Sequence, residues 1–124
     1  MNKEQLKQNF QTGSNRLWRA TGYSLQGLRA TFKNEPAFRL EVYILLPVII
    51  LGLGLGDGGI EKVLLIGSWL IVMITELMNS AIEAVVDRIG SEQHELSGRA
   101  KDIASAAVMV ALGLAGLTWL TLIF

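Results

Sequence analysis

The last 22 residues of the chain contain no charged side chain, and this run limits the possible folds more than any other feature. It covers residues 103–124, IASAAVMVALGLAGLTWLTLIF, and is long enough for a helix to cross a membrane. A second apolar run, residues 63–82, is interrupted by a single acid, Glu76. Only 18% of the residues are charged, whereas soluble domains have about 25%. The sequence therefore indicates a membrane protein rather than a very apolar soluble domain.

A third apolar run, residues 42–56, is short for a membrane span. Extending it back to Phe38 gives nearly sufficient length and places Arg39 and Glu41 near the membrane interface. We predict an all-α membrane protein in which residues 1–124 form one domain. Its transmembrane helices are expected at about 36–56, 61–86 and 100–123, after a surface helix at about 5–33.

The first 33 residues have a different pattern, in which apolar and basic residues separate on a helical wheel. The large apolar residues on one side are Leu17, Trp18, Leu25, Leu28 and Phe32. The polar residues on the other side are Arg16, Arg19, Gln26 and Lys33. This pattern favours an amphipathic helix on a membrane surface over an ordinary surface helix of a soluble domain. Because the first apolar run begins beyond residue 40, no signal peptide is expected.

Lys and Arg are unevenly distributed over the connections between the apolar runs. Residues 1–41 hold seven of the 11 basic residues, residues 57–62 hold one and residues 87–101 hold three. Positive charge concentrates on the cytoplasmic side of membrane proteins. We therefore expect the N-terminus and the second loop to be cytoplasmic.

Composition and motifs exclude several kinds of chemistry. The absence of cysteine excludes disulfides, thiolate metal sites and cysteine nucleophiles, and a single His excludes a His-rich metal centre. A net charge of zero argues against general nucleic-acid binding. The glycine-rich residues 54–59 match G-x-G-x-x-G, but an apolar span precedes them where a dinucleotide site needs a strand. We expect these glycines to mark a helix end and a turn, and no P-loop motif is present.

Polar residues recur along the second apolar run at positions 3, 4, 7 and 11 residues after Glu76. They are Asn79, Ser80, Glu83 and Asp87, and this spacing places them on the same helix face as Glu76. Charges inside a span are costly and usually face a protein interior or water. Carboxylates here suit a divalent cation and a general base. Helix–helix contacts through Asn and Ser are the alternative, but they leave Glu76 unexplained.

The second loop is dense in polar groups and ends with Lys101 and Asp102 at the start of the last apolar run. A lysine at this place can neutralise phosphate. A cytoplasmic turn of mixed charge explains the loop equally well. On the last run, small residues at Ala104, Ala107, Ala111 and Ala115 offer close helix contact.

The stretch ELMNSAIEAVVDRIG at residues 76–90, with its continuation SEQHELSGRAKD to residue 102, resembles the prokaryotic diacylglycerol kinase family. The resemblance covers essentially the whole chain, including ATGYSLQGLR at 20–29 and NEPAFR at 34–39. It implies a surface helix and three transmembrane helices, assembled as a homotrimer with shared active sites in the bacterial cytoplasmic (inner) membrane. It also implies transfer of the γ-phosphate of Mg-ATP to the hydroxyl of diacylglycerol, giving phosphatidic acid. Mg²⁺ is the expected cofactor, ATP and a membrane lipid are the expected substrates, and no nucleic acid is expected.

Carried over residue by residue, the resemblance assigns Glu76 as the general base and Glu35 and Glu83 as Mg²⁺ ligands, with Asn79 and Asp87 in support. The expected ATP-contacting positions are Arg16, Tyr23, Glu35, Glu83, Glu92, Gln93, His94, Lys101 and Asp102. The expected substrate-binding positions are Arg16, Ala20, Thr21, Gly22, Tyr23, Ser24, Leu25, Arg29, Ala30, Thr31, Phe32, Ala37, Phe38, Arg39, Leu40, Glu41, Gly54, Leu55, Gly56, Asp57, Lys62, Glu76, Ser105, Trp119, Leu120 and Thr121.

Three positions depart from the family pattern. Leu40 replaces a glutamine, so a polar contact is missing there. Pro36 replaces an alanine and favours a helix start. Lys62 replaces an arginine and cannot bind a carboxylate or phosphate through two parallel hydrogen bonds. These departures concern the lipid side of the site, not the reaction.

Three other functions are compatible with parts of the sequence. An undecaprenol kinase of the same family would use the same phosphate chemistry, although PAFR at residues 36–39 is more similar to the diacylglycerol branch. A small proton-coupled transporter could use Glu76 as its relay, but Glu83 and the polar second loop would then be superfluous. A non-catalytic assembly subunit leaves Glu76 unexplained.

Overall fold

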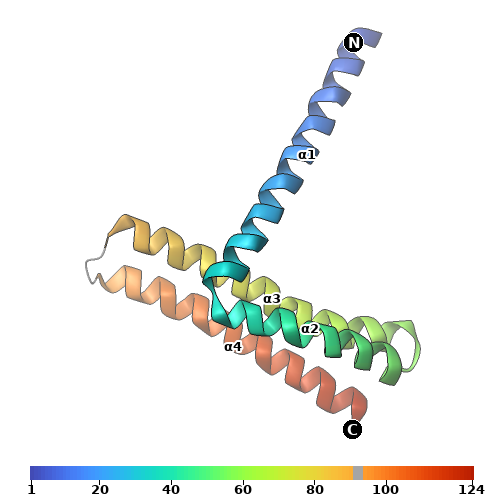
Figure 1. Ribbon diagram of the computed structural model, residues 1–124, viewed down its shortest axis with the longest axis vertical. Helices are drawn as coiled ribbons and strands as arrows, with labels where there is room; N and C mark the ends of the chain where they lie inside the picture. The colour runs from blue at the N-terminus through green and yellow to red at the C-terminus, as the bar shows by residue number, and fades with distance from the viewer. Residues whose placement is uncertain (91–93) are drawn as a thin grey trace. The chain divides into compact units, whose positions relative to one another are not determined.

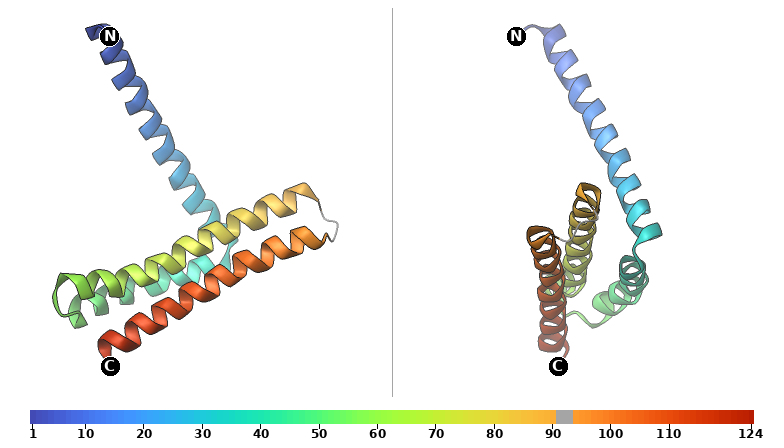
Figure 2. Two further views of the ribbon diagram at one scale, coloured as in Figure 1. Left: turned by 180° about the vertical axis from the view of Figure 1, so that it is seen from behind. Right: turned by 90° about the vertical axis from the view of Figure 1, so that its left-hand side faces the viewer.

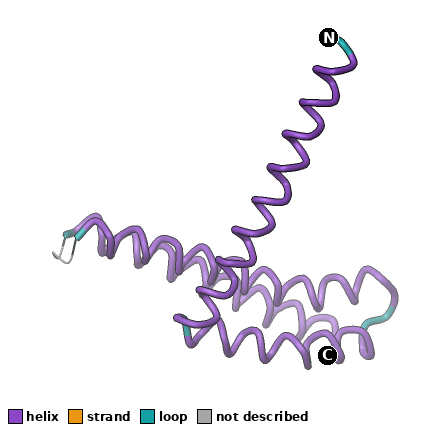
Figure 3. Tube along the Cα trace, turned by 45° about the horizontal axis from the view of Figure 1, so that its top comes forward, coloured by secondary structure: helices purple, strands orange, loops and turns teal. Residues whose placement is uncertain are grey.

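The computed structural model describes residues 1–90 and 94–124, and every regular element in them is an α-helix (Figures 1 and 3). The helices are α1 (Lys3–Asn34), α2 (Pro36–Leu55), α3 (Gly58–Ile89) and α4 (Glu95–Ile123). The chain divides into two compact units, residues 1–34 and residues 35–124. The first unit contains α1, and the second contains α2, α3 and α4.

Helix α1 begins with a reciprocal cap. The Gln5 N–H donates to Asn2 Oδ1 at 2.8 Å, and the Asn2 N–H donates to Gln5 Oε1 at 3.1 Å. This arrangement satisfies two backbone donors that a helix start otherwise leaves unpaired. The helix is two residues longer at its start and one at its end than the predicted 5–33, and none of its residues is buried. Its place on a membrane surface stays a prediction.

Helix α2 begins at Pro36, as the sequence predicts. Proline suits the first position of a helix because its φ is already helical and its missing N–H needs no partner there. Glu35 occupies the cap position, but its side chain makes no capping hydrogen bond. The helix ends at Leu55, one residue before the predicted boundary.

The turn between α2 and α3 depends on glycine. A Cβ on Gly56 would lie 2.8 Å from both Gly52 O and Lys62 Cγ, and Gly58 has φ +79°, a conformation that favours glycine. Glu61 Oε2 accepts the Asp57 N–H at 2.7 Å, which stabilises the start of α3 three residues before the predicted boundary. The expectation of a helix end and a turn at residues 54–59 is confirmed.

Helix α3 packs against both α2 and α4, and the three helices run alongside one another in alternating directions (Figures 1 and 2). Near the end of α2 the backbones approach so closely that a Cβ on Gly52 would lie 2.8 Å from Ile66 Cγ1. On the other side, Val72 of α3 forms a buried core with Ala111 and Ala115 of α4. Small residues on α4 thus allow close helix contact within one chain. Of the four alanines expected to serve this purpose, Ala107 is exposed.

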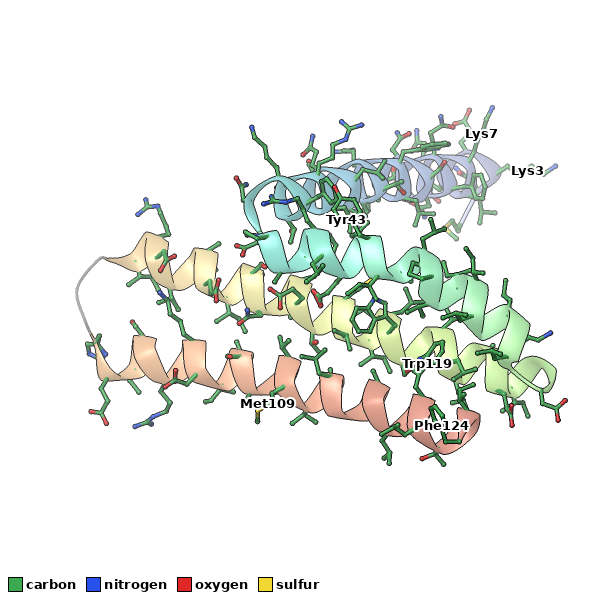
Figure 4. All side chains as sticks on the ribbon, turned by 60° about the horizontal axis from the view of Figure 1, so that its bottom comes forward. Lys3, Lys7, Tyr43, Met109, Trp119 and Phe124 are labelled. Carbon is green, nitrogen blue, oxygen red and sulfur yellow. The ribbon has the colours of Figure 1, made fainter. Side chains whose placement is uncertain are left out.

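Two indole groups link α3 to its neighbours. Trp69 of α3 donates its Nε1–H to Glu41 O of α2 at 3.0 Å, and Trp119 of α4 donates its Nε1–H to Leu65 O of α3 at 3.0 Å. Figure 4 labels Trp119. Buried tryptophan usually finds an acceptor for its N–H. These bonds fix α2 and α4 against α3 at defined residues.

The outer surfaces of α2, α3 and α4 are strongly apolar. Met109, for example, is 69% exposed and points away from α3 (Figure 4). All three helices are long and apolar enough to cross a membrane. Helices α3 and α4 also extend beyond the predicted boundaries 86 and 100, to Ile89 and back to Glu95. Residues 87–89 contain no glycine or proline, and His94 caps α4.

Candidate active site

The predicted polar row lies on one continuous helix, α3, and becomes more exposed along it. Glu76 is 6% exposed, Asn79 and Glu83 are half-buried, and Asp87 is exposed. Asn79 Nδ2 donates to Glu83 Oε1 at 3.4 Å, and the Asn79 side chain also forms a hydrogen bond with Glu76. Asn79 is therefore hydrogen-bonded to both carboxylates, and its supporting role in the reaction stays a prediction.

Helix α2 brings two more acids to Glu76. Glu35, at the start of α2, and Glu41, six residues later, both repel the Glu76 charge, as does Glu83. Glu41 is 7% exposed and lies within electrostatic range of Glu76 of α3; its expected place near the membrane interface stays a prediction. Three carboxyl groups, those of Glu35, Glu41 and Glu83, thus lie within electrostatic range of Glu76.

Helix α4 supplies a cation beside this acidic cluster. Lys101 Nζ donates to Asp87 Oδ1 at 2.7 Å and also lies within electrostatic range of Glu83. The side chains of Lys101 and Asp87 are 42% and 66% exposed, and exposed ion pairs contribute little to stability. Lys101 is therefore able to exchange its partner for a phosphate at small energetic cost. Asp102, the next residue, is exposed.

His94 has a structural role that the sequence did not reveal. Its Nδ1 accepts the Leu96 N–H at 3.0 Å and caps α4. A neutral imidazole that accepts at Nδ1 carries its proton at Nε2, so the exposed ring still has one donor for an anion. Glu92 and Gln93, two of the expected ATP contacts, lie outside the described residues.

The acidic residues are compatible with a magnesium complex rather than with a metal cage. In residues 1–90 and 94–124, no group of three His, Asp or Glu side chains is arranged to hold a metal ion. Mg²⁺ commonly binds one or two carboxylates and completes its shell with water and substrate phosphates. Glu83 and Glu35 carry carboxylates of this kind, and the Glu35 carboxylate is not used to cap its helix; their role as Mg²⁺ ligands stays a prediction.

Comparison with known proteins identifies the family. Residues 22–123 match the family model of prokaryotic diacylglycerol kinase. The chain belongs to the prokaryotic diacylglycerol kinase family. The diacylglycerol kinase of Escherichia coli (strain K12) is 53% identical over 94% of this chain and 95% of its own length. That of Haemophilus influenzae is 53% identical over 91% and 96%, and that of Pseudomonas aeruginosa 48% over 91% and 92%.

These comparisons confirm the family and the prediction that the chain is an enzyme. They also account for the three long apolar helices, which together with the family mark the chain as an integral membrane protein. The remaining ATP-contacting and substrate-binding residues that the family resemblance implies, where the structure describes them, lie on several different helices and in the turn between α2 and α3.

One group of expected diacylglycerol kinase site residues lies on α1, in the first unit. It comprises Arg16, Ala20, Thr21, Gly22, Tyr23, Ser24, Leu25, Arg29, Ala30, Thr31 and Phe32. All are exposed except Thr31 and Phe32, which are partly buried. Their assignment to ATP and lipid stays a prediction.

A second group of expected lipid contacts lies far from Glu76. Lys62 follows the turn at residues 54–57 and is fourteen residues from Glu76, or about 21 Å of helix. Trp119 binds Leu65 O at the same end of the bundle, and its neighbours Leu120 and Thr121 are exposed. The structure therefore separates these residues from the acidic cluster.

The start of α2 divides the expected lipid contacts by burial. Phe38 is 2% exposed and packs inside the bundle, whereas Ala37 and Leu40 are exposed. Arg39 is half-buried. Ser105 of α4 is exposed.

Sequence reasoning did not identify the pairing of Glu41 with Glu76, nor any role for Ser80 beyond helix contact. The Ser80 hydroxyl is buried without a hydrogen-bond partner among the described residues. A signal for Glu41 was present in the sequence, because it follows Phe38 by three residues and so shares its helix face. An acid on the same face as a core phenylalanine is expected to point inward.

Proposed function

We propose that the chain is a lipid kinase that transfers the γ-phosphate of Mg-ATP to the hydroxyl of diacylglycerol, giving phosphatidic acid and ADP. The observation that carries this proposal is the order of groups along α3. A buried acid, Glu76, is linked through Asn79 to a half-buried acid, Glu83, and then to the exposed pair of Asp87 and Lys101. This order suits a lipid hydroxyl at one end and nucleotide phosphates at the other.

In this mechanism Glu76 accepts the proton of the lipid hydroxyl. The hydroxyl oxygen forms a bond to the γ-phosphorus while the bond from that phosphorus to the bridging oxygen of ADP breaks. Phosphoryl transfer depends on alignment and charge stabilisation more than on covalent help from the protein. The hydrogen bond from Asn79 limits the orientations of the Glu76 carboxylate.

Glu35 and Glu83 would hold the magnesium complex of ATP beside Glu76. The metal, when bound, offsets negative charge on the phosphates. Asn79 keeps Glu83 oriented toward this position. Lys101 leaves Asp87 and neutralises charge on the transferred group, while the exposed Nε2–H of His94 is available to the nucleotide.

We infer that the chain acts as a homotrimer in the bacterial inner membrane, with its N-terminus and second loop in the cytoplasm. The uneven distribution of basic residues supports this orientation. The large exposed apolar surface of α2, α3 and α4 supports burial against lipid and other subunits. We further propose that residues 1–124 work as one kinase domain, with sites shared between subunits.

A radiolabelled-ATP assay in detergent, with several lipid alcohols, tests the reaction. We expect phosphate transfer to diacylglycerol and much less to undecaprenol. Transfer mainly to undecaprenol would place the chain in the other branch of the family. No transfer to either lipid, combined with Glu76-dependent proton flux in vesicles, would favour a transporter, and absence of both would favour a non-catalytic subunit.

Mixed trimers test whether sites are shared. Arg16 lies on α1 and Glu76 on α3, so we expect Arg16→Gln and Glu76→Gln chains, each inactive alone, to regain part of the activity when mixed. Rescue requires an intact α1 from one chain and an intact α3 from another. No rescue in verified mixed trimers would show that each site lies within one chain.

A further inference from the structure

The two units of the chain carry opposite net charges. Residues 1–34 hold six basic residues and one acidic residue, a net charge of +5, whereas residues 35–124 hold five basic and ten acidic residues, a net charge of −5. The first unit contains α1, in which no residue is buried. The zero net charge of the whole chain thus conceals a strongly basic helix without buried residues.

Helix α1 also presents a continuous apolar stripe. Leu6, Phe10, Leu17 and Leu28 follow one another at spacings of 4, 7 and 11 residues, which keep them on one face of the helix. Their side chains are large and exposed, and Phe10 is 80% exposed. An exposed apolar row of this length indicates a contact surface.

Two lysines adjoin the start of this stripe. Lys3 and Lys7 lie three residues before Leu6 and Phe10, so each occupies the same side of the helix about one turn earlier. Both lysines are exposed and extend away from the helix (Figure 4). A lysine can cover apolar surface with its methylene stem while its ammonium group stays in a polar layer. The start of α1 therefore fits a boundary between an apolar layer and an anionic layer.

The chain connects α1 directly to a helix that is long and apolar enough to cross a membrane. Helix α1 ends at Asn34, and α2 begins at Pro36. A connection of one residue keeps the end of α1 at the membrane surface if α2 spans the bilayer. A leaflet rich in anionic lipid places negative headgroups above an apolar interior, and basic amphipathic helices bind to such a surface. It matches both the charge and the stripe of α1.

We propose that the first half of α1, residues 3–21, is a docking surface for anionic phospholipids, in which the apolar stripe enters the leaflet and Lys3 and Lys7 bind lipid phosphates. Nearly all of this segment precedes residues 22–123, the part of the chain that matches the family, and its role goes beyond the proposed kinase function. Recognition is by charge, so any phospholipid with a net negative charge serves. The phosphatidic acid that the proposed reaction forms is one of them.

Because the chain has no cysteine, a single reporter can be attached to α1. Ser14 follows Phe10 by four residues and precedes Leu17 by three, so it lies beside the stripe. Full-length Ser14→Cys, labelled with a fluorophore, is reconstituted in vesicles of phosphatidylcholine alone or with phosphatidylglycerol. Quenching by acrylamide, which is neutral and water-soluble, measures the exposure of α1 to water. We expect less quenching with phosphatidylglycerol, and a smaller difference at high salt because salt screens the charges.

A pair of matched double variants tests the lysines in this labelled chain. Lys3→Gln/Lys7→Gln removes two charges and keeps residues of similar helix propensity. We expect the equilibrium constant for docking on phosphatidylglycerol vesicles, obtained from the quenching, to fall about 10–30-fold, since each basic residue near an anionic surface contributes about 5-fold. Arg88→Gln/Arg99→Gln removes two charges from α3 and α4 and should dock as wild type. Circular dichroism checks the helix content of every variant.

Three results would overturn the docking surface. They are equal quenching in the two kinds of vesicle, an equal loss of docking in the two double variants, and protection that depends on protein density instead of on phosphatidylglycerol. The last result would show that α1 docks on another copy of the chain. The quenching requires no ATP, so a chain that transfers no phosphate but still docks on phosphatidylglycerol would refute the kinase function alone.

Discussion

The two halves of α3 bury polar side chains in different ways. In the first half, residues 58–75, the helix satisfies its own hydroxyls. Ser68 Oγ donates to Leu65 O at 3.0 Å, and Thr75 Oγ1 donates to Val72 O at 2.8 Å. This half therefore needs no further polar partner.

In the second half, residues 76–89, polar atoms are left over. Ser80 Oγ and Asn79 Oδ1 are buried without hydrogen-bond partners among the described residues, as are both oxygens of Glu41 on the adjacent helix. Buried polar atoms are nearly always hydrogen-bonded, so unpaired ones need an explanation. The first half thus satisfies its polar groups within the bundle, whereas the second half, where the proposed mechanism places the substrate groups, does not.

Substitution of Glu76 should give the largest effect on activity. Glu76→Gln retains the shape of the side chain but cannot accept the hydroxyl proton, so we expect kcat to fall about 10²–10⁴-fold, as is typical for loss of a general base. ATP affinity and trimer assembly should stay nearly unchanged. Steady-state kinetics, equilibrium nucleotide binding and size-exclusion chromatography measure these quantities. Full turnover, or failure to assemble, would contradict the division of α3 into a packing half and a reacting half.

This division was only partly predictable from the sequence. The apolar runs, the amphipathic pattern of residues 1–33 and the glycine-rich residues 54–59 allowed all four helices to be located to within five residues, because membrane spans and turns have strong local signals. The row from Glu76 to Asp87 was predictable for the same reason, since helical spacing is a property of one element.

Contacts between elements were not predictable in this way. Neither the pairing of Asp87 with Lys101 nor that of Glu41 with Glu76 follows from spacing, because each depends on how two helices pack. The capping of α4 by His94 could not be predicted either, because a loop histidine is equally compatible with contact to solvent and with contact to a ligand. The family resemblance implied that Glu35 and Glu83 lie together, but it implied neither the contact of Asp87 with Lys101 nor the proximity of Glu41 to Glu76.

Lys101 should have the next largest effect, because it is paired with Asp87 in the second half of α3 and lies within electrostatic range of Glu83. We expect Lys101→Met to reduce kcat about 10²–10³-fold, the range for removing a group that stabilises transition-state charge. Arg99→Met is the matched control, since Arg99 is a cation on the same helix whose pairing with Glu95 is local and exposed. Steady-state kinetics at saturating ATP measure kcat for Lys101→Met and for Arg99→Met. Equal losses in the two variants would mean that general positive charge, not the position of Lys101, is required.

The carboxylates that would hold magnesium should show a smaller and more specific effect. We expect Glu35→Gln and Glu83→Gln to raise the Mg²⁺ concentration needed for half-maximal activity by about 10-fold or more, since even indirect partners of a metal change its affinity by that much. Glu61→Gln is the control, because Glu61 binds the Asp57 N–H at the other end of α3. Titrating Mg²⁺ at fixed ATP measures the shift. An unchanged Mg²⁺ requirement in both variants would remove these residues from the metal site.

The smallest effects are expected for two serines that differ mainly in which half of α3 they occupy. Ser68 is bonded to Leu65 O, whereas Ser80 Oγ is buried without a partner among the described residues. Ser68→Ala should lower stability by at most about 1 kcal/mol, the value of one hydrogen bond, and leave activity unchanged. Ser80→Ala should leave stability unchanged or slightly raise it, because an unpaired buried hydroxyl is unfavourable.

If the Ser80 hydroxyl receives a substrate group, Ser80→Ala should also reduce kcat/KM about 2–10-fold, the kinetic equivalent of one hydrogen bond. Thermal unfolding in detergent and steady-state kinetics measure the stability and the kcat/KM of each variant. We expect Ser68→Ala to lower only stability and Ser80→Ala to lower only kcat/KM. A destabilised Ser80→Ala with full activity would show that Ser80 binds another subunit in the assembled protein. The unpaired atoms of the second half would then mark helix contacts, and only the carboxylates would remain as evidence for a substrate-facing surface.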